Sequence, residues 1–584
     1  MEEKLLKIRH SLAHVLAGAI LEHDETAKFG TGPATDNGFY YDVELQNPIS
    51  PEDLPKLEEI MREILKEGFT PEMHEISYDD AKQRFKDQPY KLELIEKINT
   101  AGEKITTYTI GTFTDLCEGP HVESSKDIDP ESFMLSNVAG AYWQADENNQ
   151  MLTRVYGIAF ETKEDLEKYK EQQEEAKKRD HRKIGKELDL FAFSPLVGSG
   201  LPLFTPKGNI MRKELEDFVW SLMKPYGYER VNIPHMAKCD LYKTSGHYDK
   251  FADDIFFVKS KKTSDEFIMK PMNCPHHTQI FASSPRSYKD LPIRYSEVTT
   301  VYRDENTGQL AGLTRVRSIT QDDAHVFCTE DQVKDEVLAI YDIITKYYEV
   351  FDMPLRIRLS TNDPEKPENY LGDEKLWESS INTLKECIEA VGQTFEIGVG
   401  EAAFYGPKID FIATDAIGRE WQLATAQLDF NLPERFELEY TDKDGSKKRP
   451  VMIHRAISGS LERFLGVAIE HFAGKFPLWL SPVQVGIVPV AEAHHEKAEE
   501  LKQKLEDAGL RANINKEDTS LGKRLYAFKG QYVPYMIVLG DKEVESDEII
   551  LEHRDLGKLD PLSIDAAVEK LREERDGRLL APKQ

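Results

Sequence analysis

The sequence is poor in cysteine and has no long apolar run. Its 584 residues include five cysteines at irregular spacing, which excludes a disulfide framework and fits a reducing cytosol. No stretch of about eighteen or more apolar residues occurs, so we expect no membrane-spanning helix. The chain starts with acidic side chains and helically spaced apolar positions, unlike a secretory signal peptide. These absences predict a cytoplasmic protein.

A surplus of positive charge is also missing. The chain has 75 Lys and Arg against 105 Asp and Glu, a net charge of −30. A general nucleic-acid-binding protein needs a broad basic surface, so this balance argues against that class. One RNA partner of matching shape remains compatible with it, because the local field of a cleft matters more than the total charge.

The chain is too long for one hydrophobic core, and patterns of helix and strand divide it into four parts. Residues 1–165 mix helical and strand patterns and predict an α+β domain. Residues 166–187 are nearly all charged and predict a solvent-exposed connecting helix. Residues 188–478 form the largest unit. Residues 479–584 alternate strand and helix and predict a small α/β domain with a mostly parallel sheet.

Three residues that can bind a metal lie far apart in the sequence. They are Cys274 in MKPMNCPHH, His325 in TQDDAHVFC and His454 in PVMIHRAISGS. A catalytic zinc site needs three protein ligands and an open fourth position for substrate. Each residue alone is typical of a buried core or capping side chain, but if the three converge, they predict that zinc holds a substrate here.

Three segments around these residues resemble the signature motifs of the class II aminoacyl-tRNA synthetases. A long amphipathic helix is followed by a strand, Arg303 and Glu305 are expected on a later strand, and Arg315 and Arg317 on the strand that returns. The third segment opens a helix with Arg463 in its first turns. One Arg-x-Glu pair would indicate an ordinary surface ion pair, whereas three motifs in order favour the family. MNCPHH, TQDDAH, AFYGPKIDF, WQLATAQLDF and VMIHRAISGS are similar to the threonyl-tRNA synthetase family specifically, from about the first residue to the end.

This resemblance implies a fold and a reaction. The expected fold is an antiparallel-sheet class II catalytic core with an N-terminal α+β editing domain and a C-terminal α/β anticodon-binding domain. The expected reaction joins L-threonine to tRNA(Thr) through a threonyl-adenylate, with Mg²⁺ accompanying ATP. A homodimer is expected because the first motif builds the dimer interface in this class. Because the resemblance begins at the editing helix, we expect the ubiquitin-like domain of many members to be absent.

The resemblance also assigns residues to the activation reaction, which must align two anions and spread developing charge. It implies that Arg303 binds the α-phosphate, Glu305 the adenine amino group and Arg315 the β- and γ-phosphates, while Arg463 lies across the adenine. One zinc ion per subunit would be held by Cys274, His325 and His454. Residues for the amino acid and its transfer would be Gln321, Asp323, Tyr405, Lys408, Gln422, Thr425, Gln427 and Ser460.

Zinc has a chemical purpose in such an enzyme. Threonine and valine are nearly the same shape, so an apolar pocket separates them by only about a hundredfold. Zinc can take both the amino group and the hydroxyl of threonine, and valine has no hydroxyl. Serine keeps the hydroxyl and lacks one methyl group, worth only about 1–3 kcal/mol. Serine is therefore expected to enter, and a second site must remove it.

The N-terminal domain contains a candidate for this second site. His10 and His14 are four residues apart and share a helix face, and Cys117 and His121 have the same spacing. This set resembles the editing domain of threonyl-tRNA synthetases and of alanyl-tRNA editing proteins, and Lys91 and Asp115 match further editing positions. Spacing alone favours a second zinc site, as in the alanyl relatives. We follow the threonyl resemblance, which implies that the set positions water without metal.

Two positions in the catalytic domain depart from the family pattern. Ile319 stands where an aromatic residue usually covers the adenine, which removes stacking worth about 0.5–1.5 kcal/mol and predicts weaker ATP binding. His276 stands where the family usually has glycine. We expect that neither His276 nor His277 is a metal ligand.

The C-terminal domain also departs from the family. Glu543 in PYMIVLGDKEVE is expected to read an anticodon base. Asp518 and Glu552 occupy positions that usually hold Asn and Arg, and both add negative charge near RNA phosphates. Anticodon readout is either rebuilt here or uses Arg554.

Three other functions compete with this interpretation. A seryl or prolyl ligase would share the core motifs, but the His454 segment and the editing domain argue against it. A catalytically inactive RNA-binding regulator predicts damage at Arg303, Arg463 or a metal ligand, and all of these are intact. A free-standing editing factor is excluded by the large central domain.

Overall fold

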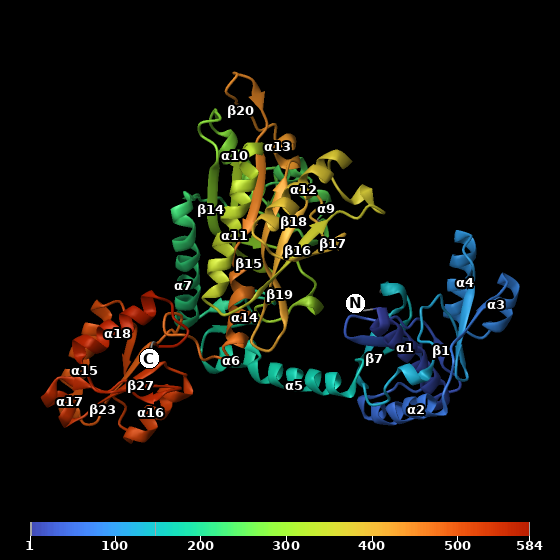
Figure 1. The fold of residues 1–584 in the computed structure, drawn as a ribbon, viewed down its shortest axis with the longest axis horizontal. Coiled ribbons are helices and arrows are strands. Elements are labelled where there is room, and N and C mark those ends of the chain that lie inside the picture. The colour runs from blue at the N-terminus through green and yellow to red at the C-terminus, as the bar shows by residue number, and fades with distance from the viewer. Residues whose placement is uncertain (1–2, 147, 251, 583–584) are drawn as a thin grey trace. The chain divides into compact units, whose positions relative to one another are not determined.

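The structure is a computed structural model that describes residues 3–146, 148–250 and 252–582 (Figure 1). Its internal contacts divide the chain into two compact units, Met1–Glu175 and Ala176–Gln584, and each is considered by itself. Among the described residues, no helix combines the length and the apolar character that a membrane crossing requires.

The first unit is built on a four-stranded antiparallel sheet. Its strand order is β1 (Lys28–Phe29), β2 (Gly38–Glu44), β7 (Met151–Ala159), β6 (Phe133–Tyr142). Helix α1 (Glu3–His23) packs against β2 and against α2 (Leu54–Glu67). Because α1 is covered on two sides, nearly every residue from Ser11 to Ile20 is buried, including Leu12 and Leu16.

A smaller layer completes this unit. The antiparallel strands β3 (Glu72–Glu75), β4 (Thr106–Ile110) and β5 (Phe113–Leu116) form a sheet, with α3 (Tyr78–Arg84) and α4 (Pro89–Ala101) beside it. Strand β5 also contacts α1. The residues that directly follow β5 are therefore brought to the helix that carries His10 and His14.

The connection between the units is not the single exposed helix expected over 166–187. The structure has α5 (Lys163–Arg179) and α6 (His181–Glu187). Asp180 separates them because its side chain accepts the backbone N–H of Arg182, as an N-cap does. His181 and Ile184 are buried, and α6 contacts α14 (Leu461–His471). The second half of the connection therefore belongs to the packed core of the second unit.

The second unit is organised around an eight-stranded sheet. Its strand order is β10 (Glu229–Arg230), β14 (Ile293–Tyr302), β15 (Ser318–Cys328), β22 (Val451–Ala456), β19 (Glu420–Asp429), β18 (Lys408–Thr414), β16 (Leu355–Thr361), β17 (Phe395–Val399). The outer pairs β10–β14 and β16–β17 are parallel and the others antiparallel. The expected antiparallel core is therefore confirmed.

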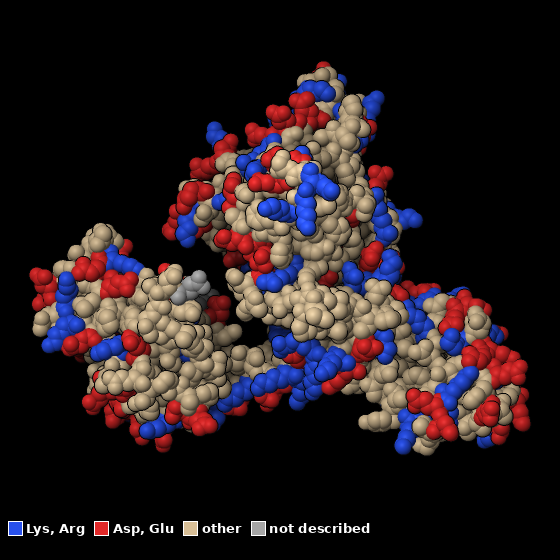
Figure 2. Space-filling view, turned by 180° about the vertical axis from the view of Figure 1, so that it is seen from behind, with Lys and Arg blue, Asp and Glu red and all other residues tan. Residues whose placement is uncertain are grey.

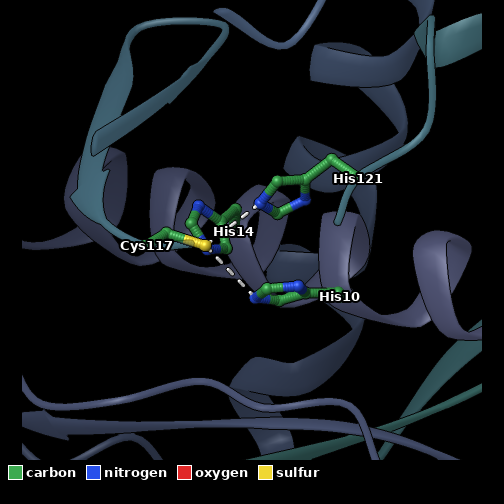
Figure 3. Close-up of side chains that lie close together, drawn as sticks. All are labelled: His10, His14, Cys117 and His121. Atoms are coloured by element: carbon green, nitrogen blue, oxygen red, sulfur yellow. Dashed lines mark hydrogen bonds between the residues drawn. The ribbon is translucent and has the colours of Figure 1, made fainter. Parts of the chain in front are cut away.

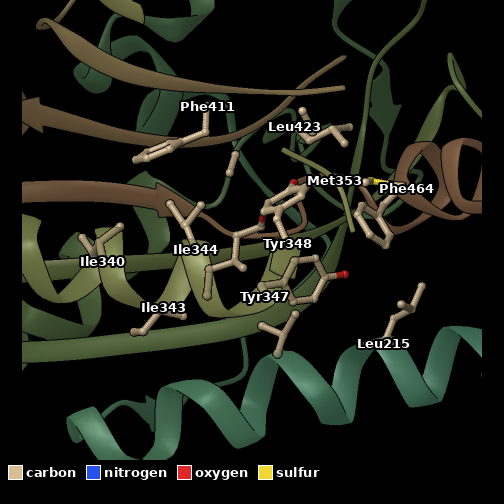
Figure 4. Close-up of a cluster of buried hydrophobic side chains, with 14 of the residues drawn as sticks. Leu215, Ile340, Ile343, Ile344, Tyr347, Tyr348, Met353, Phe411, Leu423 and Phe464 are labelled. Carbon is tan, nitrogen blue, oxygen red and sulfur yellow. The ribbon is translucent and has the colours of Figure 1, made fainter. Parts of the chain in front are cut away.

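One face of this sheet holds the largest apolar core. Helices α7 (Pro206–Met223), α11 (Val333–Glu349) and α14 contribute to it. Figure 4 shows Ile344 and Tyr347 of α11, Leu215 of α7 and Phe411 of β18 in this cluster, all of them buried. The core fixes which face of each central strand is closed and leaves the opposite face for polar side chains.

Further elements surround the sheet. They are β11 (Met236–Lys238), β12 (Phe257–Lys259) and β13 (Glu266–Met269) in one small sheet, the pairs β8–β9 (Phe191–Ala192, Leu203–Phe204) and β20–β21 (Tyr440–Thr441, Lys447–Lys448), and the helices α8 (Cys239–Ser245), α9 (His247–Lys250), α10 (Cys274–Ala282), α12 (Glu374–Ala390) and α13 (Asn431–Arg435).

The C-terminal part has its own five-stranded sheet. Its order is β24 (Ala512–Ile514), β23 (Val485–Pro489), β25 (Tyr535–Leu539), β27 (Glu552–His553), β28 (Gly557–Lys558). The first three strands are parallel, and β27 and β28 are antiparallel. The α/β class is confirmed, while the sheet is only partly parallel. Around it lie α15 (His495–Asp507), α16 (Leu521–Gly530), α17 (Asp541–Ser546), α18 (Ile564–Asp576) and the pair β26–β29 (Glu548–Ile549, Leu562–Ser563).

Candidate functional sites

The central strands place the polar candidates on the face opposite the large core. Successive side chains of a strand point to opposite faces. On β15, Ala324 and Val326 enter the core, so Gln321, Asp323 and His325 face the other way. The same alternation on β19 and β18 brings Thr425, Gln427, Asp429 and Lys408 to this polar face.

A β-bulge places one further residue there. The register of β18 and β19 shifts so that Phe411 pairs with Ala424 while Ile412 pairs with Gln422. Leu423 is the extra residue, and it packs into the core beside Ala424. Such an insertion changes the face of the sheet to which the side chains beyond it point. It lets Gln422 Nε2 donate a hydrogen bond of 2.7 Å to a carboxylate on the polar face.

The three candidate metal ligands converge on this face. His325 on β15 and His454 on β22 are direct partners in the strand register, and Cys274 is the first residue of α10. One ligand atom of each lies within 4.8 Å of the others. His325 Nε2 and His454 Nδ1 are 3.0 Å apart. All three side chains are buried, so the group is screened from bulk water.

Both imidazoles are oriented by a second partner. His454 Nε2 lies 2.8 Å from Asp429 Oδ2, where an N–H donates to the carboxylate and leaves the Nδ1 lone pair free. His325 Nδ1 lies 2.7 Å from His277 Nδ1, so Nε2 is the nitrogen of His325 that faces His454 Nδ1. Zinc-binding histidines usually have such a partner on the other ring nitrogen. The donor set, one thiol and two oriented imidazoles, therefore fits zinc.

Two further histidines, His247 and His276, lie beside this group. His247 Nε2 is 3.7 Å from Cys274 Sγ, and its Nδ1 is 2.8 Å from Ser245 Oγ. Burial lowers the pKa of His247 to about 3, so its ring is neutral at neutral pH. His276 Nδ1 is 3.4 Å from Tyr242 Oη, and His276 is not part of the metal-capable group. None of the sequence motifs indicated a role for His247.

The side chains expected around the amino acid lie next to the metal-capable group. The Tyr405 ring stacks on His454 with centroids 4.9 Å apart, and its hydroxyl donates to Gln427 Oε1 at 2.6 Å. Asn273 Nδ2 donates to Asp323 Oδ2 at 2.9 Å. Burial raises the pKa of Asp323. Tyr405, Gln427 and Asp323 thus form a polar wall beside His454.

Lys408 belongs to a cluster that the sequence did not reveal. Its Nζ lies 2.6 Å from Asp410 Oδ2. The same carboxylate accepts Ser360 Oγ at 2.7 Å as well as Gln422 Nε2. Strand register explains the cluster, because Ser360 is the partner of Lys408 and Thr425 is the partner of Asp410.

The arginines of the expected strand pair lie in the loop between the strands. Strand β14 ends at Tyr302 and β15 begins at Ser318, so the expectation that Arg303, Glu305, Arg315 and Arg317 lie on strands was wrong. Polar residues and glycine between them form a turn that interrupts the pairing. Arg315 donates to Glu305 Oε2 at 2.9 Å from Nε. Arg317 donates to the carbonyl oxygen of Glu305 at 2.8 Å, which holds the two ends of the loop together.

Arg463 begins the third motif as expected. It lies in the first turn of α14, where Ser460 Oγ accepts its backbone N–H at 3.1 Å. Its guanidinium is 5.9 Å from the ring centroid of Trp421. Gln321 pairs with Ser460 through an isolated bridge, so the start of α14 is attached to β15.

A second candidate site lies in the first unit (Figure 3). His10 and His14 of α1 meet Cys117 and His121, which follow β5, and one ligand atom of each lies within 4.8 Å of the others. Cys117 Sγ is 3.5 Å from His10 Nε2 and 3.3 Å from His121 Nε2. Burial, then the nearby imidazoles, lowers the pKa of His121 to about 2, and burial also lowers the pKa of His10 and His14. The cluster is neutral at neutral pH.

An ion pair borders this cluster. Lys91 of α4 pairs with Asp115 of β5, and its Nζ donates to Tyr41 Oη at 3.1 Å. Tyr41 also donates to Asp115, a role that the sequence did not indicate. A cavity of about 430 Å³ is lined by Lys91 and Asp115 together with His10, His14 and Cys117. A volume of this size is sufficient for a small ligand or the end of a larger one.

The C-terminal candidates are mostly engaged within the protein. Glu543 Oε2 accepts the Gly540 N–H at 2.9 Å and so caps α17. Glu552 pairs with Lys529 at 2.9 Å, and Asp518 is exposed. The Arg554 guanidinium donates to the carbonyl oxygens of Tyr532 and Lys475 at 2.9 and 2.7 Å. Of the two alternatives for anticodon readout, these bonds favour a rebuilt site over one that uses Arg554.

Basic side chains gather on one segment of this acidic chain. Figure 2 shows Lys and Arg along the connection made by α5 and α6. The end of α5 and the exposed side of α6 carry Lys177, Lys178, Arg179, Arg182, Lys183 and Lys186. A local positive field of this kind attracts phosphates even when the total charge is negative.

Family models match three parts of the chain. Residues 256–472 match the class II core domain of the tRNA synthetases for G, H, P, S and T. Residues 484–574 match an anticodon-binding domain. Residues 105–156 match the second additional domain of threonyl- and alanyl-tRNA synthetases.

Relatives match nearly the whole length. Threonine–tRNA ligases of Deinococcus radiodurans and Thermus thermophilus are each 47% identical, covering 94% and 98% of this chain and 85% and 89% of their own. That of Thermotoga maritima is 45% identical over 97% of this chain and 87% of its own. The structure entitled RNA-binding domain of threonyl-tRNA synthetase from Cryptosporidium parvum superposes with a TM-score of 0.65 at 35% identity, covering 69% of this chain and 99% of that one. With these matches in the same order as the sites, the chain belongs to the threonyl-tRNA synthetase family, the threonine–tRNA ligases.

Proposed function

We propose that this threonine–tRNA ligase forms a threonyl-adenylate, selects threonine through zinc at Cys274, His325 and His454, and hydrolyses mischarged Ser-tRNA(Thr). The observation that carries zinc selection is the convergence of these three buried donors, with His325 and His454 each oriented by a further side chain. ATP, threonine and tRNA are the substrates of the family reaction. Mg²⁺ would accompany the ATP.

The side chains around the metal-capable group are arranged to bind threonine. When bound, zinc would supply a Lewis acid that takes the amino group and the hydroxyl of the amino acid. Gln427 and Tyr405 bond to each other at 2.6 Å and so present a fixed wall. Asp323, held by Asn273, adds a carboxylate for the amino group, and Gln321 lies on the same face of β15.

The loop arginines and α14 are arranged to bind ATP. Arg303 would stabilise the α-phosphate and carboxylate as the adenylate forms, and Arg315 the two outer phosphates. Glu305 would accept from the adenine amino group, and Arg463 would lie across the ring. Arg315 and Glu305 pair with each other at 2.7 Å, so binding of ATP exchanges this ion pair for contacts to the nucleotide.

Residues on β18 and β19 would serve the acyl transfer. Lys408 is held against Asp410, and Gln422 bonds to the same carboxylate. Thr425 lies opposite Asp410 in the register. This arrangement keeps the Lys408 ammonium group fixed beside the amino-acid pocket. Ser460, at the start of α14, would also take part in the transfer.

The first unit would edit without a metal. His10, His14 and Cys117 line one cavity, and His121 lies against them. These neutral hydrogen-bonding groups are suited to orient water against the ester of Ser-tRNA. The Lys91–Asp115 pair fixes one side of the cavity. In this assignment residues 1–165 edit, 166–187 connect, 188–478 activate the amino acid and 479–584 bind the anticodon, with Glu543 as a contact.

The active form would be a homodimer. The segment directly before α7 exposes large apolar side chains, with Leu196 98% and Phe193 42% exposed. Exposed apolar groups close together mark a protein interface, and α7 is the helix of the first motif. Light scattering of the intact protein should give twice the mass of the 66.9 kDa chain.

The test is ATP–pyrophosphate exchange with threonine, serine and valine, on protein assayed for zinc. We expect strong exchange with threonine, weaker exchange with serine and none with valine. Cys274→Ser should abolish exchange while deacylation of Ser-tRNA continues. Cys239→Ser, at another buried free cysteine, is the matched control. Normal activation by Cys274→Ser would refute the zinc assignment, and no exchange by the unaltered protein would favour a non-catalytic RNA-binding regulator.

A further inference from the structure

We propose that His181 is a positioning residue for ATP binding, which ties the loop of residues 303–317, here called the ATP loop, to helix α14. This inference rests on the proposed ATP-binding roles of Arg315 and Arg463. His181 is the first residue of α6 and is only 4% exposed. None of the motifs or family assignments above gives it a function.

Both ring nitrogens of His181 have a partner. The backbone N–H of Leu313, in the ATP loop, donates to Nε2 at 2.9 Å. Nδ1 lies 2.6 Å from Glu470 Oε1 in the last turn of α14. Because Nε2 accepts, the ring proton is on Nδ1 and is donated to the carboxylate. The ring therefore has one defined tautomer with a bond in each direction.

The loop approaches His181 too closely for a side chain. Gly312 has φ of +53°, and a Cβ there would lie 2.2 Å from His181 Nε2. Glycine allows both this backbone conformation and the contact. Leu313 itself is fully buried in the large core, so the loop is fixed at this point.

The backbone at Leu313 is directly linked to Arg315, the residue proposed to bind the outer phosphates of ATP. Ala311 and Arg315 form a two-way backbone bridge, with N–O distances of 3.1 and 3.4 Å. Gly312 and Leu313 lie inside this bridge. A displacement of Leu313 away from His181 must therefore move the backbone of Arg315.

The other end of the connection is equally fixed. Glu470 Oε1 also accepts the backbone N–H of His181 at 3.1 Å, and its Oε2 lies 2.6 Å from Arg419. Burial opposes the charged form, but the bonds from His181 and the charge of Arg419 outweigh it, and the pKa of Glu470 is lowered. Helix α14, which carries Arg463, is thereby held to the ATP loop through one imidazole.

A metal site explains the arrangement of Asp180, His181 and Glu470 less well than the hydrogen bonds do. Asp180, His181 and Glu470 place ligand atoms within 4.8 Å of one another. However, a backbone N–H occupies the lone pair of Nε2, and the Nδ1 proton is directed to Glu470. Neither nitrogen is available as a ligand unless the loop contact breaks.

Two isosteric substitutions separate positioning from general stability. In His181→Asn the amide nitrogen can replace Nδ1, but nothing replaces the Nε2 acceptor. In His181→Gln the amide oxygen can reach the position of Nε2 and accept the Leu313 N–H, while Glu470 still accepts the backbone N–H of residue 181. We expect His181→Asn to raise KM for ATP in pyrophosphate exchange about three- to tenfold, the effect of one lost hydrogen bond. KM for threonine should not change, and His181→Gln should stay within about twofold of the unaltered protein.

Two controls accompany this pair. Glu187→Ala alters an exposed residue of the same short helix that is outside the basic segment, and it should leave KM for ATP unchanged. His553→Asn alters another buried histidine whose Nδ1 accepts backbone N–H groups, at 3.2 Å, and should lower Tm without affecting KM for ATP. Equal KM values for His181→Asn and the unaltered protein would overturn the proposal. Equal rises in KM for ATP and for threonine would also overturn it.

Hydrogen–deuterium exchange gives a readout that does not depend on activity. The Leu313 amide should be protected in the unaltered protein and in His181→Gln, and should exchange faster in His181→Asn. Unchanged protection in His181→Asn would overturn the positioning role. If the protein shows no pyrophosphate exchange but His181-dependent protection persists, the proposed ATP reaction fails while the tie between loop and helix stands.

Discussion

Replacing Asp429 by Asn should weaken zinc binding without unfolding the site. Asp429 Oδ2 lies 2.8 Å from His454 Nε2, and Oδ1 accepts the backbone N–H groups of Asn431 and Leu432 at 2.8 and 2.9 Å. Asparagine keeps an oxygen for the two backbone bonds. Its amide nitrogen then faces His454 Nε2 and can only donate, so the imidazole proton must move to Nδ1. That proton occupies the position from which His454 would bind zinc.

The size of the effect follows from this change of tautomer. Loss of the hydrogen-bond partner that orients a metal-binding histidine typically costs about 10–100-fold in metal affinity, or about 1.4–2.8 kcal/mol. Zinc-depleted protein should be titrated with zinc in competition with a chromophoric chelator, and thermal unfolding should check that the variant is folded. We expect a dissociation constant 10–100-fold higher for Asp429→Asn.

Asp442→Asn is the matched control. Asp442 pairs with Lys448 on the β20–β21 hairpin, away from the metal-capable group, and its variant should bind zinc as the unaltered protein does. Asp429→Ala is less informative, because it also removes the bonds at the start of α13. Unchanged zinc affinity in Asp429→Asn would refute the assignment of His454 Nδ1 as a ligand.

The remaining predictions concern ATP, editing and metal content. Ile319→Phe should lower KM for ATP about two- to tenfold through restored stacking, with Ile319→Leu as the control, and an unchanged KM would contradict this. His10→Ala with His14→Ala should slow Ser-tRNA deacylation at least about 100-fold and leave exchange intact, whereas His74→Ala, at an exposed histidine of the same unit, should change neither. Because the pKa values of His10, His14 and His121 are lowered, deacylation should not fall between pH 7.5 and 6, where an ordinary histidine becomes about three-quarters protonated. Elemental analysis should find one zinc per chain, and none in Cys274→Ser.

Local patterns in the sequence predicted much of the secondary structure. The antiparallel core is present as the resemblance implied. The helix that contains His10 and His14 and the α/β class of the C-terminal domain are present as local patterns predicted. These features depend on short-range periodicity, which a single sequence displays. The convergence of Cys274, His325 and His454 came from resemblance, because no local pattern connects residues so far apart.

The misplaced features depend on contacts between distant segments. Residues 166–187 are almost uniformly charged, and their composition does not show that His181 would bond to Leu313 and Glu470. The resemblance placed the loop arginines on strands, whereas β14 ends at Tyr302 and β15 begins only at Ser318. The roles of Asp429 and His277 follow from their contacts with His454 and His325, which no local pattern shows.

The surroundings of the two Cys/His clusters explain why one should hold zinc and the other should not. Cys274 lies in the field of two carboxylates, Asp323 and Asp429, opposed by Arg303, and an excess of negative charge favours a dication. Around Cys117, the charges of Asp115 and Lys91 act in opposite directions, and these two groups are paired with each other. A dication there would face the Lys91 ammonium, and the second carboxylate near Cys117, that of Glu118, is exposed, so that water and salt screen its charge. Similar donor atoms in the two clusters therefore serve different chemistry, because the adjacent charges differ.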